Sequence, residues 1–311
     1  MKIAQAIAAY VASRQSLGMR FVTEARTLKS FCRTIGDVDM EQVDPARVRC
    51  FLDGTGPVTL FWHRKLDALR GFYRFALARE YVTTSPLPTA VPQPSRSFVP
   101  YIYSLDEVRR LIDATHYLDH RNLSGLTCRT LLLILYGTGL RISESLGLDI
   151  TDVDLQDRLL YIRETKFYKT RLVPTGPDLT KVLATYAAQR NQHSPPTIDD
   201  SFLLTRCGVR PSRAAAESVF QQLREAAGVR RTDNSRYQPR LHDFRHTFAV
   251  TRLIRWYRDG ADVQLLLPQL ATYLGHVHIG GTQRYLSMTP ELLRHASVRF
   301  ERYAMGGDDH A

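Results

Sequence analysis

The sequence predicts a mainly α-helical protein of two domains, with a small β-hairpin region in the second. Apolar residues recur at helical spacing from the N-terminus to about Val82, prolines are concentrated in residues 85–100, and only residues 159–174 favour strands. With 311 residues, each domain can bury a core of its own. We therefore expect a helical domain at 1–84, a linker at 85–100 and a second domain at 101–311.

Four helices account for the first domain. The first ends near Gly18, a candidate C-terminal cap, and Thr23 can cap the second. Asp44 before Pro45 is an N-cap followed by the proline that helices favour in their first turn. The fourth helix, expected at 57–79, leaves basic side chains outside its apolar stripe, where they could track phosphates or simply be solvated. These side chains are Arg64, Lys65, Arg70 and Arg74.

The proline-rich stretch marks the domain boundary, because its five prolines and its serines favour an extended linker. Ser104 with Glu107 then forms a capping box that opens the second domain. Two short antiparallel strands are expected within residues 159–174. Further helices are expected near residues 178–190, 213–227, 242–257 and 263–273.

Charge suggests a partner but does not identify it. The chain carries 42 basic against 31 acidic residues, a net charge of +11, which would attract a polyanion such as nucleic acid. A merely basic, soluble enzyme remains an equal alternative, because the basic residues are spread along the whole chain.

The four cysteines lie far apart and show neither a disulfide framework nor zinc-ligand spacing, so a reducing cytosol fits best. The most apolar stretch, residues 131–136, is too short to cross a bilayer. The alanine-rich N-terminal segment has helical periodicity without the apolar core of a targeting signal. We expect a cytoplasmic protein with no membrane partner.

Three segments carry side chains suited to binding a phosphate. A glycine turn places Arg141 at a helix start, and His242 and Arg245 stand one helical turn apart. Leu-Gly-His ends at His276, and Tyr285 follows nine positions later. Each segment alone has an ordinary explanation, since a lone tyrosine is usually a half-buried core residue and a lone arginine usually a surface one.

In their order, these segments closely resemble the tyrosine recombinases, also called phage integrases. The signature of that family is Arg, a Lys on a β-hairpin, His-x-x-Arg, Leu-Gly-His and finally Tyr. The likeness covers residues 103–285, and residues 69–76 are similar to the last helix of the family's core-binding domain, although Ser85-Pro86 stands where Asn-Pro is common. The resemblance implies a two-domain clamp around double-stranded DNA and a homotetramer on two DNA sites, with related recombinases as further possible partners.

The resemblance also implies a role for each residue. Arg141, Arg245 and His276 would hold the non-bridging oxygens of the scissile phosphate, and Tyr285 would attack its phosphorus to form a 3′-phosphotyrosyl link. His242 would accept the phenol proton. Attack builds negative charge on these oxygens, which two preorganised arginines can stabilise, so we expect no metal ion and no cofactor.

A lysine of the hairpin would protonate the departing 5′-oxygen. Lys166 matches the family's spacing, but Phe167 and Tyr168 follow it where small residues are common, so Lys169 remains a substitute. Lys169 is also a candidate DNA contact, together with the basic residues of the fourth helix. His246 is assigned to support, and Glu144 to orienting its neighbours. His278 is a rival to His276, but only His276 follows Leu-Gly.

The expected function is site-specific DNA recombination, in integration, excision or transposition. A type IB topoisomerase uses similar residues, and a DNA-binding protein that does not cut could share the fold. A metal-dependent nuclease is a weaker alternative, because no acidic pair is clustered. Residues 290–303 are expected to form a terminal helix that packs on its own chain or on a neighbouring subunit, and residues 265–272 suggest a transposon or plasmid branch.

Overall fold

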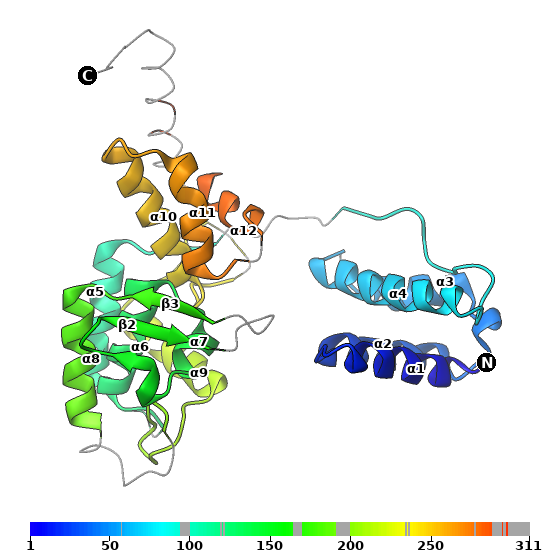
Figure 1. Cartoon of the computed structure of the whole chain (residues 1–311), viewed down its shortest axis with the longest axis horizontal. Coiled ribbons are helices and arrows are strands. Elements are labelled where there is room, and N and C mark those ends of the chain that lie inside the picture. Colours follow the sequence, from blue (N-terminus) through cyan, green and yellow to red (C-terminus); the bar gives the residue numbers. More distant parts are fainter. Residues whose placement is uncertain are drawn as a thin grey trace. The chain divides into compact units, whose positions relative to one another are not determined.

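The computed structural model describes residues 1–56, 58–93, 100–118, 120, 122–163, 170–190, 200–233, 235, 237–276, 278–287, 294 and 297. It contains two compact units, Met1–Phe98 and Val99–Ala311, shown in Figure 1. Among the described residues, no helix combines the length and the apolar character that a membrane span requires.

The first unit is a bundle of four helices around an apolar core that includes Phe31, Leu66 and Phe72. Its helices are α1 (Ile3–Ser16), α2 (Val22–Ile35), α3 (Pro45–Asp53) and α4 (Leu60–Ala78), with a short 3₁₀ helix at Met40–Gln42. The Asp44 carboxylate accepts a hydrogen bond from the Ala46 amide at 2.8 Å, so the expected cap of α3 is confirmed.

Two expected helix starts in this unit were wrong. Helix α2 begins at Val22, before Thr23, and its N-cap is Phe21 in a left-handed conformation with a φ of 44°. The Phe21 ring packs edge-on against Tyr10 with ring centroids 5.3 Å apart, and this tertiary contact accompanies the earlier start. Helix α4 begins at Leu60 rather than near residue 57, because the Thr59 hydroxyl accepts from the Phe61 amide.

The second unit is mostly helical and carries one small sheet. Its α-helices are α5 (Leu105–Ala114), α6 (Gly125–Thr138), α7 (Ile142–Leu146), α8 (Pro177–Gln189), α9 (Arg213–Ala226), α10 (Asp243–Arg258), α11 (Val263–Leu274) and α12 (Gly280–Gln283). Short 3₁₀ helices lie at Thr115–Tyr117, Ile150–Asp152 and Arg284–Ser287. The capping box of α5 is present as expected, with both Ser104–Glu107 hydrogen bonds formed.

The sheet is antiparallel with the order β1-β2-β3. Strands β2 (Leu159–Ile162) and β3 (Arg171–Pro174) are the two expected strands, and β1 (Val153–Asp154) adds a two-residue edge. In the register, Ile162 lies opposite Arg171. The expected hairpin lysines, Lys166 and Lys169, lie outside the described residues.

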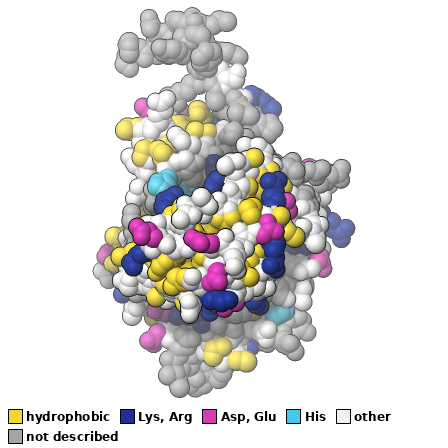
Figure 2. All heavy atoms as spheres, turned by 90° about the vertical axis from the view of Figure 1, so that its right-hand side faces the viewer, with side chains coloured by type: hydrophobic (Ala, Val, Ile, Leu, Met, Phe, Trp, Pro, Cys, Tyr) yellow, Lys and Arg dark blue, Asp and Glu magenta, His cyan; other side chains and the backbone are white. Residues whose placement is uncertain are grey.

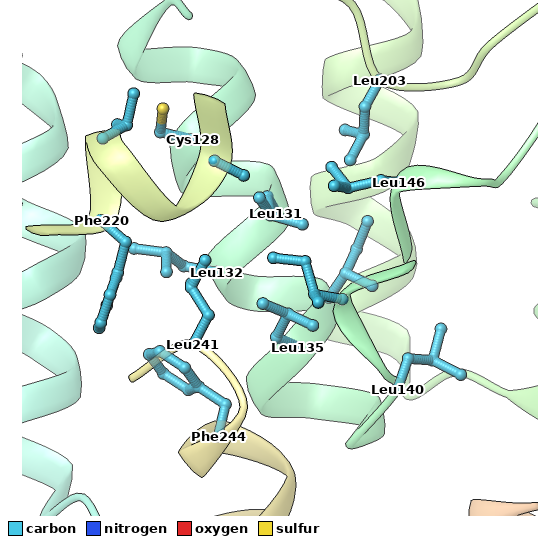
Figure 3. Close-up of a cluster of buried hydrophobic side chains, with 14 of the residues drawn as sticks. Cys128, Leu131, Leu132, Leu135, Leu140, Leu146, Leu203, Phe220, Leu241 and Phe244 are labelled. Atoms are coloured by element: carbon cyan, nitrogen blue, oxygen red, sulfur yellow. The ribbon is translucent and has the colours of Figure 1, made fainter. Parts of the chain in front are cut away.

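Helix α6 runs through the main core of this unit, and Figure 3 shows its Leu131, Leu132 and Leu135 pointing into that core. Leu140, Leu241 and Phe244 come from other segments and join the same cluster. Each of these three is a chain neighbour of a candidate site residue. Core packing therefore fixes the main chain next to Arg141, His242 and Arg245.

A second apolar cluster of this unit joins α10 and α11 and includes Leu253, Leu267, Leu274 and Tyr285. The chain enters the unit along α10, where the Tyr103 ring stacks on Phe244 at 4.5 Å and the Tyr103 amide donates to the Thr247 hydroxyl at 2.9 Å. The expected terminal helix at 290–303 lies outside the described residues except for positions 294 and 297.

On the face drawn in Figure 2, Lys and Arg side chains are interspersed with acidic and apolar ones, so charge alone does not mark a binding surface there.

Candidate active site

The first part of the site is the turn between α6 and α7. Gly139 ends α6 with a φ of +64°, and a Cβ added there would lie 2.6 Å from the Phe248 side chain. Both facts require glycine at this position. The turn places Arg141 at the N-cap of α7, where Nη1 donates to Glu144 Oε1 at 2.7 Å and Nη2 donates to the Gly275 carbonyl at 3.0 Å.

Arg245 lies at the centre of the site. Its residue is only 2% exposed, and its guanidinium donates to the Gly139 carbonyl at 3.0 Å and to the Leu274 carbonyl. These bonds join α10 to the glycine turn and to the end of α11. Burial, together with the charge of Arg141, lowers the pKa of Arg245 to about 10, so the side chain is still cationic at neutral pH.

His276 follows the end of α11. Gly275 closes that helix with a φ of +69°, and the Nδ1 atom of His276 lies 2.7 Å from the Thr282 hydroxyl oxygen. Burial and the nearby charge of Arg245 lower the pKa of His276 to about 4. The ring is therefore neutral at pH 7 and offers one N–H donor and one acceptor nitrogen.

Tyr285 completes the cluster from the 3₁₀ helix at Arg284–Ser287. Its residue is 3% exposed, and its ring stacks on His276 with centroids 6.1 Å apart. Burial raises the pKa of Tyr285, and the charge of Arg245 opposes that rise. The phenol is therefore protonated at neutral pH and stands beside a fixed cation.

Two further histidines connect Tyr285 to the start of α10. The His246 ring lies 5.6 Å from the Tyr285 ring and 5.0 Å from the His242 ring, all measured between centroids. Although His242 is exposed, desolvation by the surrounding protein and the charge of Arg245 lower its pKa to about 4. His242 is thus neutral at pH 7 and able to accept a proton.

Arg171 is a member of this cluster that sequence reasoning missed. Its guanidinium donates to both Glu144 oxygens, at 3.2 and 2.8 Å, and its Nε donates to the Tyr273 carbonyl at 2.9 Å. Although burial alone would raise the pKa of Glu144, hydrogen bonding and charge from Arg171, with a contribution from Arg141, bring it below its ordinary value. The one signal for Arg171 is a charged residue at the start of a predicted strand, which is also typical of a solvated edge.

The candidate DNA contacts of α4 differ among themselves. Arg64, Arg70 and Arg74 are exposed. Lys65 is half-buried, and its ammonium donates to the Phe51 carbonyl at 2.6 Å, near the end of α3.

Within the described part of the chain, no group of three or more His, Cys, Asp or Glu residues could hold a metal ion.

Residues 103–291 match the model of the Phage integrase family. The chain belongs to this family. The matched segment begins at Tyr103 and includes Arg141 and Tyr285, so the site described above lies within the part of the chain that matches the family.

Similar family members cover most of the chain. The putative integrase/recombinase y4rE of Sinorhizobium fredii is 36% identical over 295 residues, which is 93% of each chain. The tyrosine recombinase XerD of Bifidobacterium longum is 30% identical over 249 residues, covering 78% of this chain and 76% of XerD. The solved Tn1549 transposon integrase, in complex with transposon right end DNA, shares the fold with a TM-score of 0.74 at 16% identity, covering 98% of this chain and 100% of that one.

Proposed function

We propose that this integrase-family chain is a site-specific DNA recombinase that breaks and rejoins strands through Tyr285. The observation that carries the proposal is the convergence of Arg141, Arg245, His276 and Tyr285, which come from four segments of the second unit. The phenol oxygen forms a bond to phosphorus while the bond from phosphorus to the 5′-oxygen breaks. The products are a 3′-phosphotyrosyl link and a free 5′-hydroxyl, and the reverse reaction joins strands without ATP.

The two arginines suit the charge that this reaction builds. Negative charge grows on the non-bridging oxygens as the nucleophile approaches, and cationic donors that are already oriented stabilise it without reorganisation. Arg245 is held by two main-chain carbonyls, and Arg141 by Glu144 and the Gly275 carbonyl. His276 adds a neutral donor beside them.

Proton transfer assigns roles to the remaining residues. His242 takes the phenol proton, and Lys166, with Lys169 as its substitute, gives a proton to the departing 5′-oxygen. When DNA binds, its phosphate lies near Arg141 and Arg245 and offsets their positive charge, which contributes to the low pKa of His242. DNA binding therefore raises the pKa of His242 and makes this ring a better proton acceptor. Since Tyr285 is 3% exposed, the 3₁₀ helix at Arg284–Ser287 must move before the phenol reaches a duplex.

The partner is double-stranded DNA, which both units contact as a clamp, with α4 supplying Arg64, Arg70 and Arg74 for phosphates. Four protomers act on two DNA sites. The family membership supports this assembly. Residues 265–272, which precede the Leu-Gly-His segment, support the transposon or plasmid branch. We also propose a cytoplasmic location, which the DNA substrate and the expectation of reduced cysteines support.

The test uses DNA from the flanks of the gene, nicked near the expected cleavage point so that the cleaved strand diffuses away. Wild type should leave a protein-linked strand in excess EDTA, and Tyr285→Phe should bind the same DNA without forming the adduct. Mixing two labelled duplexes should yield recombinant strands, which a topoisomerase would not produce. An adduct formed by Tyr285→Phe would refute the assignment of the nucleophile.

A further inference from the structure

Arg171 contacts two parts of the proposed phosphate site. These are Glu144, which also binds Arg141, and the main chain at the end of α11 before His276. Its side chain is 10% exposed, and that of its partner Glu144 is 8% exposed. One guanidinium makes three hydrogen bonds, two to the Glu144 carboxylate and one to the Tyr273 carbonyl. It therefore joins β3 to α7 and to the end of α11.

The shared carboxylate connects Arg171 to Arg141. Glu144 Oε1 accepts from both arginines, at 2.7 Å from Arg141 and 3.2 Å from Arg171, and Oε2 accepts from Arg171 at 2.8 Å. Because Arg171 takes both oxygens, the Arg141 guanidinium makes one hydrogen bond to this carboxylate, beside the bond from the Arg141 main-chain amide, and keeps its other terminal nitrogen on the Gly275 carbonyl. Without Arg171, the buried carboxylate would have Arg141 as its remaining cationic partner and would draw both prongs of that guanidinium toward itself.

The turn that carries His276 rests on the same side chain. A Cβ added at Gly275 would lie 2.8 Å from Nη1 and 3.0 Å from Cζ of Arg171. The Tyr273 carbonyl, two residues earlier, accepts from Arg171 Nε. The guanidinium thus packs against the main chain from Tyr273 to Gly275, immediately before His276.

We propose that Arg171 is a positioning residue for strand cleavage, which holds Glu144 and the Tyr273–Gly275 main chain so that Arg141 and His276 face the scissile phosphate. The inference rests on the proposed recombinase function. Arg171 acts through these neighbours and needs no contact with DNA.

The decisive test varies the charge of the scissile phosphate. A methylphosphonate at that position replaces one non-bridging oxygen by a methyl group, so the site no longer has to neutralise a negative charge. Arg171→Met should slow single-turnover cleavage of ordinary DNA by about 100-fold, the size expected for a displacement of about 1 Å in an active site. The ratio of ordinary to methylphosphonate cleavage rates should fall at least about tenfold, because a misdirected Arg141 matters less for the neutral substrate.

Arg163→Met is the matched control. Arg163 follows the other long strand of the sheet and pairs with the buried carboxylate of Asp152, but its side chain is 58% exposed and it contacts neither Glu144 nor the Tyr273 carbonyl in the described structure. This variant should cleave both substrates like wild type. Urea denaturation and DNA affinity, measured for every variant, establish that the proteins compared are folded and bound.

The outcomes separate the two levels of the argument. If wild type forms no adduct, the proposed function fails. If wild type cleaves and Arg171→Met cleaves ordinary DNA within about threefold of it, or loses both substrates equally while folded, the positioning role fails. If Arg171→Met does not fold, Arg171→Lys carries the test, since lysine keeps the charge but cannot span both Glu144 oxygens and the Tyr273 carbonyl; the same fall in the rate ratio is then required.

Discussion

Replacing His246 by glutamine should make the stability of the second unit less sensitive to acid. His246 is 8% exposed, and burial, followed by the charges of His242 and neighbouring arginines, lowers its pKa to about 3. An unfolded histidine has a pKa of about 6.5. The unfolded chain therefore binds a proton that the folded chain excludes, and the free energy of unfolding falls as the pH drops from about 6.5 toward 3.

The size of the effect follows from these two pKa values. Between about pH 7.5 and pH 5, the unfolded histidine gains a proton worth about 2 kcal/mol, while the folded one remains neutral. His242 and His276 shift in the same direction, so wild type should lose more than this amount. The loss in His246→Gln should be smaller by about 2 kcal/mol, even if that variant is less stable at both pH values.

Urea denaturation followed by tryptophan fluorescence measures this difference. The chain has two tryptophans, and Trp256 lies on α10 with His246, whereas Trp62 lies on α4 of the first unit. A Trp62→Phe background leaves a signal from the second unit alone. If both proteins lose the same free energy of unfolding over this pH range, His246 is not held neutral by its surroundings and the reasoning fails.

Three further predictions concern the turn, the lysine and the DNA contacts. Gly275→Ala should lower the free energy of unfolding by about 1–3 kcal/mol, because a positive φ and the Arg171 guanidinium both oppose a Cβ; a urea midpoint equal to wild type would contradict this. Lys166→Ala should slow cleavage by about 10²–10⁴-fold, because the departing 5′-oxygen loses its proton donor. A DNA substrate with sulfur in place of that bridging oxygen should restore the rate, since the sulfur leaves without a proton. If Lys169→Ala shows this behaviour instead, Lys169 is the acid. Arg74→Ala should reduce the slope of log affinity against log salt by about 1, whereas Lys65→Ala, whose ammonium is bonded to a carbonyl, should lower stability and leave the slope unchanged.

Local features were predictable because their physics spans only a few residues. The Asp44 cap bonds to an amide two positions away, and the capping box of α5 spans three. The order Arg141, His242, Arg245, His276 and Tyr285 matched a family signature. Of these five residues, Arg141, Arg245, His276 and Tyr285 make up the core of the site and do lie together. The start of α2 was not predictable from Thr23, because the N-cap is Phe21, whose ring contacts Tyr10 of another helix.

The contacts of Arg171 could not be predicted, because its partners are distant in sequence. Glu144 is 27 positions away and Tyr273 is 102 positions away. The strand pattern predicts that Arg171 has an extended backbone, but it does not predict which helix ends lie next to its side chain. The burial of Tyr285 is a similar case, since it follows from the packing of α10 and α11 rather than from the residues beside it.

The three arginines at the centre of this chain share one kind of acceptor. Arg141, Arg171 and Arg245 each donate to at least one main-chain carbonyl, at Gly275, Tyr273, Gly139 or Leu274. A main-chain carbonyl is present whatever side chain its residue carries, so the path of the backbone determines how these cations are oriented. Substitutions that leave this path unchanged should therefore leave the arginines oriented, whereas a side chain at Gly139 or Gly275, where the backbone turns at positive φ, should disturb them.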